Sequence, residues 1–116
     1  MPQPSKYDIR VNARAAYLAD QSDEAAGRYV FAYTITITNA GSVPAQLISR
    51  HWIITDANEK TQEVRGLGVV GEQPLLEPQQ SFEYTSGTAI ATGVGTMRGS
   101  YHMLAADGHE FDAAIP

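Results

Sequence analysis

Apolar and polar residues alternate along most of this 116-residue chain, with the period of two that is typical of half-buried β-strands. The clearest case is residues 28–39, where Tyr29, Phe31, Tyr33, Ile35 and Ile37 share one face and threonine and small residues occupy the other. β-Branched and aromatic residues dominate this stretch, as a pleated surface requires. No window of a dozen residues has the spacing of an amphipathic helix. The pattern therefore predicts an all-β protein.

Seven segments carry this alternation, and polar turns separate them at intervals of roughly ten residues. They cover residues 9–17, 28–39, 45–55, 61–64, 80–86, 96–104 and 110–115. Residues 86–95 are a loop or an irregular strand. This spacing is typical of an antiparallel β-sandwich of about seven strands, fibronectin type III-like or immunoglobulin-like. We expect one domain over residues 1–116, with a short disordered N-terminus at about 1–6.

The alternation also predicts which side chains fill the core. We expect the following residues mostly to be buried between the sheets: Trp52, Phe31, Tyr33, Ile35, Ile37 and Phe82. Arg50 falls on the same face as Trp52, so we expect it at a sheet edge, paired with a carboxylate, or presented to an anion. The chain has more aromatic residues than one small core requires, and a few of them would form a surface for a partner.

Gly66, Gly68 and Gly71 form the pattern G-x-G-x-x-G, which holds a dinucleotide only where a helix follows the glycines. Pro74 and Pro78 prevent that helix, so we predict no dinucleotide site. Two interpretations remain open. One is a tight, bulged connection that needs glycine backbones. The other is an anion site in which backbone N–H groups bind phosphate or pyrophosphate with help from arginines, namely Arg65, Arg50 and Arg98.

Composition excludes several classes of partner and site. The net charge of −5 argues against binding to nucleic acid or an anionic membrane, which relies on basic surface. There is no cysteine, so disulfides and thiolate metal sites are excluded. No apolar stretch has the length of a signal peptide or a membrane span, so we expect a cytoplasmic protein.

The residue pattern assembles no recognisable chemistry. His102 and His109 flank the last predicted turn with several carboxylates, but their spacing matches no established set of metal ligands. No serine lies in a nucleophile-elbow motif. We therefore predict no metal site, no cofactor and no catalytic residue, and we expect the protein not to be an enzyme.

Several segments together resemble the ApaG family, also called CorD, over nearly the whole chain. They are residues 29–39, 49–56, 64–74, 82–87 and 95–101. The resemblance implies the same sandwich fold and associates the chain with cobalt and magnesium tolerance. The domain also occurs inside larger eukaryotic proteins, including F-box proteins, which implies binding to a protein partner. We therefore expect an interaction module whose protein partner is unknown, with self-association left open. The alternative is a binder of a nucleotide, phosphate or pyrophosphate at residues 66–71.

Overall fold

The computed structural model describes residues 6–116, so nearly all of the expected disordered segment, residues 1–6, lies outside the described residues. The described chain forms two short 3-10 helices and eight strands. The helices are η1 (Ala19–Gln21) and η2 (Glu24–Ala26), and the strands are β1 (Ile9–Tyr17), β2 (Tyr29–Asn39), β3 (Ala45–Asp56), β4 (Thr61–Leu67), β5 (Leu75–Leu76), β6 (Ser81–Ile90), β7 (Gly95–Ala105) and β8 (Glu110–Ile115). No helix in residues 6–116 is long and apolar enough to cross a membrane.

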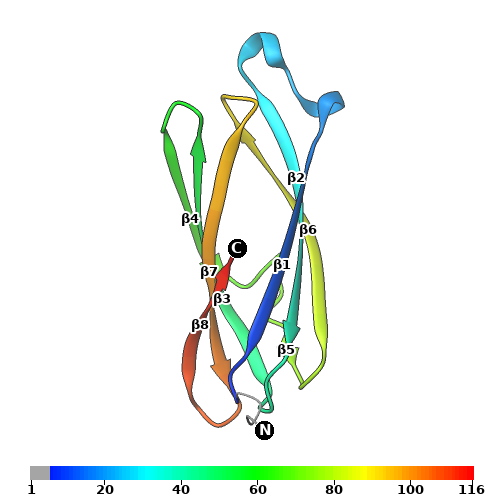
Figure 1. Ribbon diagram of the computed structural model, residues 1–116, viewed down its shortest axis with the longest axis vertical. Helices are drawn as coiled ribbons and strands as arrows, with labels where there is room; N and C mark the ends of the chain where they lie inside the picture. The colour runs from blue at the N-terminus through cyan, green and yellow to red at the C-terminus, as the bar shows by residue number, and fades with distance from the viewer. Residues whose placement is uncertain (1–5) are drawn as a thin grey trace, which may run out of the picture.

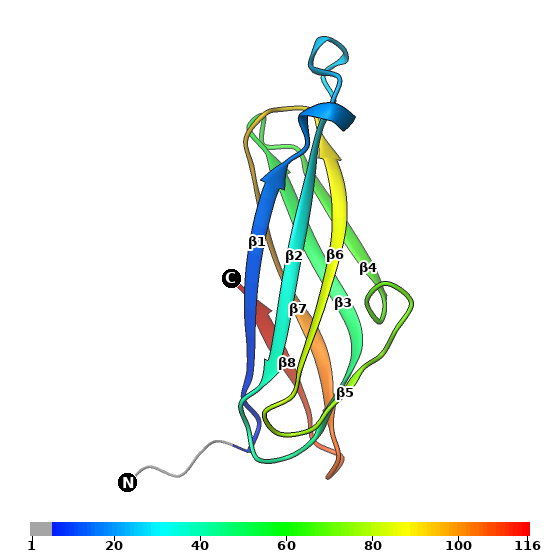
Figure 2. The same ribbon diagram turned by 90° about the vertical axis from the view of Figure 1, so that its right-hand side faces the viewer.

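The strands form two antiparallel sheets that lie face to face (Figures 1 and 2). One sheet has the order β1-β2-β6 and the other the order β4-β3-β7-β8, with β5 paired to the remaining part of β3. This architecture confirms the expected antiparallel β-sandwich. The strand that the alternation did not reveal is β5, because two residues are too few to show a period.

Strand ends follow from local chemistry. The hairpin between β3 and β4 turns where the Asp56 carboxylate accepts hydrogen bonds from the backbone N–H groups of Asn58 and Lys60. The hairpin between β7 and β8 turns at Gly108, whose φ of +90° suits glycine. Strand β6 continues to Ile90, beyond the expected end at residue 86, because it pairs with β2 as far as Tyr29.

The core lies between the sheets, and three of the six side chains predicted for it, Trp52, Ile35 and Ile37, are buried. The other three, Phe31, Tyr33 and Phe82, are only half-buried. The sheets therefore close tightly over one part of the sandwich and leave an opening over another.

Candidate functional site

The glycine-rich connection between β4 and β5 is a compact hairpin held by its own backbone. Val69 and Glu72 exchange two N–H to C=O hydrogen bonds, of 2.8 and 2.9 Å, around a turn formed by Val70 and Gly71. Both turn residues have positive φ, +45° and +80°, as a two-residue hairpin turn of this hand requires. The Val69 side chain is fully buried and anchors the loop in the core. No helix follows the glycines, as the prolines predict.

Arg50 fastens this loop to the sheet. Its Nη1 donates to the carbonyl oxygens of Leu67 at 3.1 Å and of Gly68 at 2.8 Å. The guanidinium lies so close to Gly66 that an added Cβ would come within 2.9 Å of it. The N–H of Gly68 donates to the carbonyl of Ile48 in the adjoining strand at 2.8 Å. Arg50 thus binds carbonyl groups of the loop, and the Gly68 amide binds the backbone of β3.

Of the other two arginines of the expected anion site, Arg65 lines a shallow hollow together with Arg50 and Gly66, and Arg98 does not line it. In the strand register, Arg65 is opposite His51 and Arg98 is opposite Ile53, one residue away from the positions of Arg50 and Trp52. Since successive strand residues point to opposite faces, Arg65 and Arg98 lie on the outer face of the four-stranded path. Arg65 is 3.9 Å from Glu63 there. The structure therefore does not bring Arg50, Arg65 and Arg98 together on one face.

His102 and His51 contact different carboxylates. The two ring nitrogens of His102 lie 2.9 Å from Glu110 and 2.9 Å from Asp112, and hydrogen bonds to these carboxylates, that to Glu110 above all, raise the pKa of His102. His51 is 3.2 Å from Glu63. Within residues 6–116, no group of three or more His, Asp or Glu side chains is arranged to hold a metal ion.

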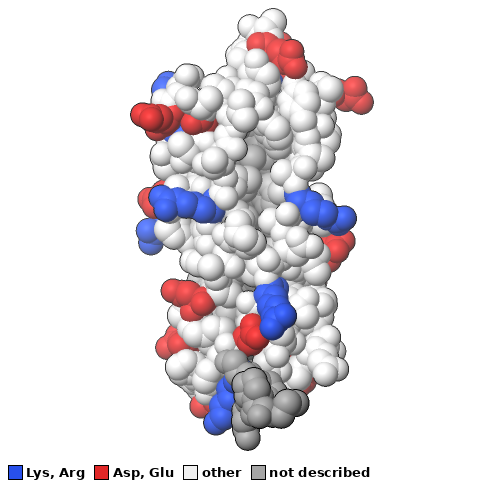
Figure 3. Space-filling model, in the orientation of Figure 1, with Lys and Arg blue, Asp and Glu red and all other residues white. Residues whose placement is uncertain are grey.

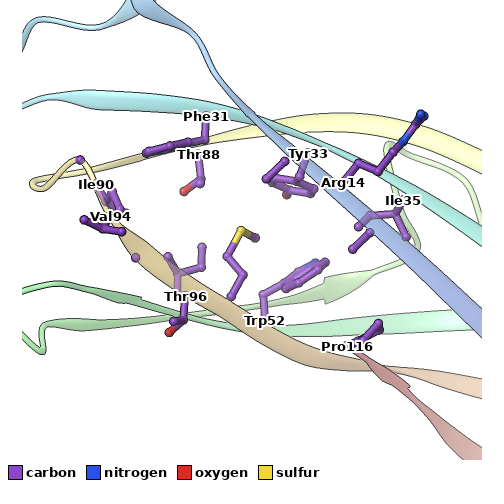
Figure 4. Close-up of a pocket in the computed structure, with 16 residues that line it drawn as sticks. Arg14, Phe31, Tyr33, Ile35, Trp52, Thr88, Ile90, Val94, Thr96 and Pro116 are labelled. Carbon is purple, nitrogen blue, oxygen red and sulfur yellow. The ribbon is translucent and has the colours of Figure 1, made fainter.

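An apolar groove with a volume of about 340 Å³ lies between the sheets. Figure 4 shows Phe31 and Tyr33 on one side of it and Trp52 on the other, with Pro116 at one end and Val94 near the opposite end. The ring centroids of Tyr33 and Trp52 are 5.5 Å apart across it. We call this hollow the inter-sheet groove, and its further lining residues are Ala13, Arg14, Ala15, Ile35, Ile54, Thr88, Ile90, Gly93, Gly95, Thr96 and Met97.

The groove lies beside the part of β7 that does not pair with β8. Ile115, the last residue of β8, pairs with Gly99, whereas β7 begins four residues earlier, at Gly95. The gap between β7 and β1 is lined by Pro116 at one end. The β1 residues that face the gap, Ala13 and Ala15, are small and exposed. On the face drawn in Figure 3, charged side chains lie to both sides and its upper middle is free of them.

Sequence reasoning singled out the aromatic excess but not this groove. The signal present in the sequence is the group of small residues on β1 and at the start of β7, which cannot fill the space between two sheets. Its meaning depends on where β8 ends relative to β7, and strand register is not visible in a single sequence.

Comparison with known proteins adds the family. A family model described as the ApaG domain matches residues 19–105. The chain is 66% identical over 116 residues to Protein ApaG of Thiobacillus denitrificans and 64% identical to Protein ApaG of Nitrosomonas eutropha, covering 100% of this chain and 91% of each relative. A crystal structure of an ApaA protein from Bordetella pertussis superposes with a TM-score of 0.96 at 55% identity, covering 98% of this chain and 93% of that one.

Proposed function

Because this chain belongs to the ApaG family, whose name specifies a fold and no reaction, we propose from its geometry that it is a non-enzymatic protein-interaction module. The observation that carries the proposal is the inter-sheet groove. Phe31, Tyr33, Trp52 and Met97 line a space that is open to solvent and apolar. Aromatic and methionine side chains in a concave apolar site are the usual anchors of a protein interface.

The groove fits a partner better than it fits a catalytic centre. Its one charged lining side chain is Arg14, which is exposed and points away from the cavity in Figure 4. Acid–base or nucleophilic chemistry needs titratable groups that converge on one point. Within residues 6–116, no serine or threonine hydroxyl is hydrogen-bonded to a histidine. These features favour binding over catalysis.

Two neighbouring alanines of β1 provide a matched test. Ala15 lines the groove, whereas Ala16 is the next residue and faces the opposite side of the same strand. Both are exposed, so glutamate at either position leaves the core intact. Ala15→Glu places a charge at the groove, where a partner would have to bury it. Ala16→Glu adds the same charge outside.

The experiment is an affinity pull-down from cell extract with the wild type and both variants, followed by mass spectrometry of bound proteins and small molecules. We expect proteins retained by the wild type and Ala16→Glu to be lost with Ala15→Glu. Equal retention by all three chains would remove the groove from the interaction. If Ala15→Glu loses a bound small molecule but no bound protein, the groove is a small-molecule site and the interaction proposal is wrong.

A further inference from the structure

We propose, beyond the function of the groove, that β4 joins two copies of this chain edge to edge in a symmetric dimer. The strand pairs antiparallel with β4 of the second copy around a two-fold axis at Val64. One continuous sheet then runs through both copies. The edge of β4 is regular and exposed, its backbone groups point outward at alternate residues, and the order of its charges is self-complementary.

Within residues 6–116, β4 has β3 on one side and no strand on the other (Figure 1). In the order β4-β3-β7-β8 it is the edge opposite β8. Its residues are exposed except Gly66, which is half-buried, and its seven pairs with β3 run without a bulge. It has no proline and no lysine, which commonly protect an edge from pairing. This edge is therefore a regular template for another strand.

The hydrogen bonds between β3 and β4 determine which backbone groups remain for a second copy. At one end of this ladder, the N–H of Asp56 donates to the carbonyl of Lys60 at 3.0 Å. At the other end, the N–H of Gly68 donates to the carbonyl of Ile48 at 2.8 Å. Hydrogen-bonded pairs alternate along an antiparallel ladder, so the even-numbered residues of β4 are bonded to β3. The residues whose N–H and C=O groups point outward are Thr61, Glu63, Arg65 and Leu67.

A two-fold axis at Val64 pairs all of these outward-directed residues. Glu63 then lies opposite Arg65 of the second copy, and Thr61 lies opposite Leu67, each pair occurring twice because of the symmetry. Opposite charges at directly facing positions stabilise an antiparallel pair, whereas like charges destabilise it. An axis at Glu63 or at Arg65 sets that charge against its own copy, and an axis further along the strand pairs fewer residues. The order of charges therefore selects one register.

The side chains at this edge are available for the contacts. Glu63 and Arg65 are 54% and 72% exposed and lie 3.9 Å apart within one chain. The Glu63 carboxylate is also 3.2 Å from His51. Both contacts use Oε1, which leaves Oε2 for Arg65 of the second copy. Val64 is 38% exposed, and at the axis it packs against Val64 of the second copy, which removes apolar surface from water.

The charges also distinguish β4 from the other strands at the ends of the two sheets. Among β1, β6, β4 and β8, which take these positions in the described chain, β4 alone carries charges of both signs. The charged residues of β1 are both basic, and those of β6 and β8 are all acidic, namely Arg10, Arg14, Glu83, Glu110 and Asp112. Pairing any of these three strands with its own copy brings like charges together and no opposite ones.

The dimer leaves the inter-sheet groove accessible. In the described chain, no residue of β4 lines that groove. A dimer therefore presents two grooves, and a partner with two binding segments gains avidity that one groove cannot give. Contact along a single strand is small, and small interfaces are transient. We therefore expect a reversible dimer that forms at high protein concentration.

The test measures self-association of the full chain by sedimentation and by backbone amide chemical shifts, up to a concentration of about 1 mM. We expect concentration-dependent shifts at residues 61–67. Glu63→Arg and Arg65→Glu each set like charges against each other, so either variant alone should dimerise at least about tenfold more weakly. An equimolar mixture of the two variants restores both opposite-charge pairs and should dimerise as the wild type does. Ala15→Glu, which acts at the groove, should leave dimerisation unchanged.

A disulfide locates the axis, because the chain has no cysteine of its own. In Val64→Cys the two thiols face each other across the axis, at a non-hydrogen-bonded pair with Cα atoms about 4.5 Å apart, which a disulfide can bridge. Gln62→Cys is the matched control, since residue 62 lies on the same face but opposite Gly66 of the second copy. Mild oxidation should link Val64→Cys and leave Gln62→Cys monomeric.

Three results would overturn the dimer. They are a wild type that stays monomeric at about 1 mM, a mixture of the two charge variants that fails to associate, and equal linking of both cysteine variants. None of them bears on the groove, because the pull-down with Ala15→Glu and Ala16→Glu tests that proposal separately. Concentration-dependent shifts at residues 61–67, together with association of the mixture but of neither charge variant alone, would establish the pairing of β4 with its own copy.

Discussion

The hydroxyl groups of Tyr84 and Tyr101 are hydrogen-bonded to each other in the core and join β6 of one sheet to β7 of the other. Burial raises the pKa of both phenols, so both stay protonated at physiological pH. Each hydroxyl satisfies the other in surroundings that offer little water. The pair therefore fixes how the two sheets sit against each other at this point.

Removing both of these hydroxyls should lower the unfolding free energy by less than the sum of the two single removals. Tyr84→Phe or Tyr101→Phe leaves the remaining hydroxyl buried without its partner, which costs about 1–3 kcal/mol of unfolding free energy. The double variant leaves no orphan, so its cost should be well below the sum of the two. Urea denaturation of the four chains measures the coupling. Strictly additive costs would show that the hydroxyls act independently.

Stability should depend on pH through His102. Glu110 first, and then Asp112, raise the pKa of this imidazole above its usual 6.5 in the folded state. The protonated form is thus favoured by folding. Its contribution is complete below about pH 6.5 and is lost as pH rises through the folded pKa. His102→Gln should flatten that part of the stability profile, as measured by denaturation midpoints across this range.

Asp112→Asn is the companion variant for that experiment. It removes one of the two carboxylates and should lower the His102 pKa, which imidazole proton shifts report directly. The His102 side chain is 38% exposed, so salt should weaken the effect of the carboxylates on its pKa. A His102 pKa at or below the ordinary value in the wild type would contradict the arrangement.

Val70 should be replaceable with a gain in stability. It is a β-branched residue with a φ of +45°, a conformation that such side chains rarely adopt. Asparagine tolerates this region and is preferred before glycine in this kind of turn. Val70→Asn should raise the unfolding free energy by about 0.5–1 kcal/mol. The neighbouring variant Val69→Asn should destabilise strongly, because Val69 is fully buried. No gain at Val70 would mean that the turn carries no strain.

The glycine loop should not bind nucleotides. Its Gly68 and Val69 amides already donate within the protein, and Arg50 donates to the loop's carbonyls. Titration with ATP or pyrophosphate should give no saturable shift at Gly66, Gly68 or Gly71. Arg50→Ala should instead lower stability by about 1–3 kcal/mol, because it leaves the partly buried Gly68 carbonyl without this hydrogen bond. Saturable binding centred on those glycines would restore the anion-site interpretation.

Alternation in the sequence was sufficient to predict the sandwich, most strand positions and the shared face of Arg50 and Trp52. It works because burial on one face imposes a period of two. It left open whether β6 extends to Ile90, since residues 86–89 (Ser-Gly-Thr-Ala) are all small and carry no alternation in size. Arg50 was expected at a sheet edge, paired with a carboxylate, or presented to an anion. Its contacts with the carbonyls of Leu67 and Gly68 depend on a fold that brings the loop back to β3. The groove depends on register, which local patterns do not encode.

Trp52 is the one tryptophan of the chain, and its indole lies in the groove wall. The rings of Tyr33 and Tyr101 are 5.5 and 6.4 Å away, close enough to pass excitation energy to it. Indole emission from this protein therefore originates at a single place, and it is sensitive to the polarity of what lies beside the ring. Expelling water from the groove should shift the emission wavelength. The intrinsic fluorescence of Trp52 can therefore report whether the groove is occupied, without an added label.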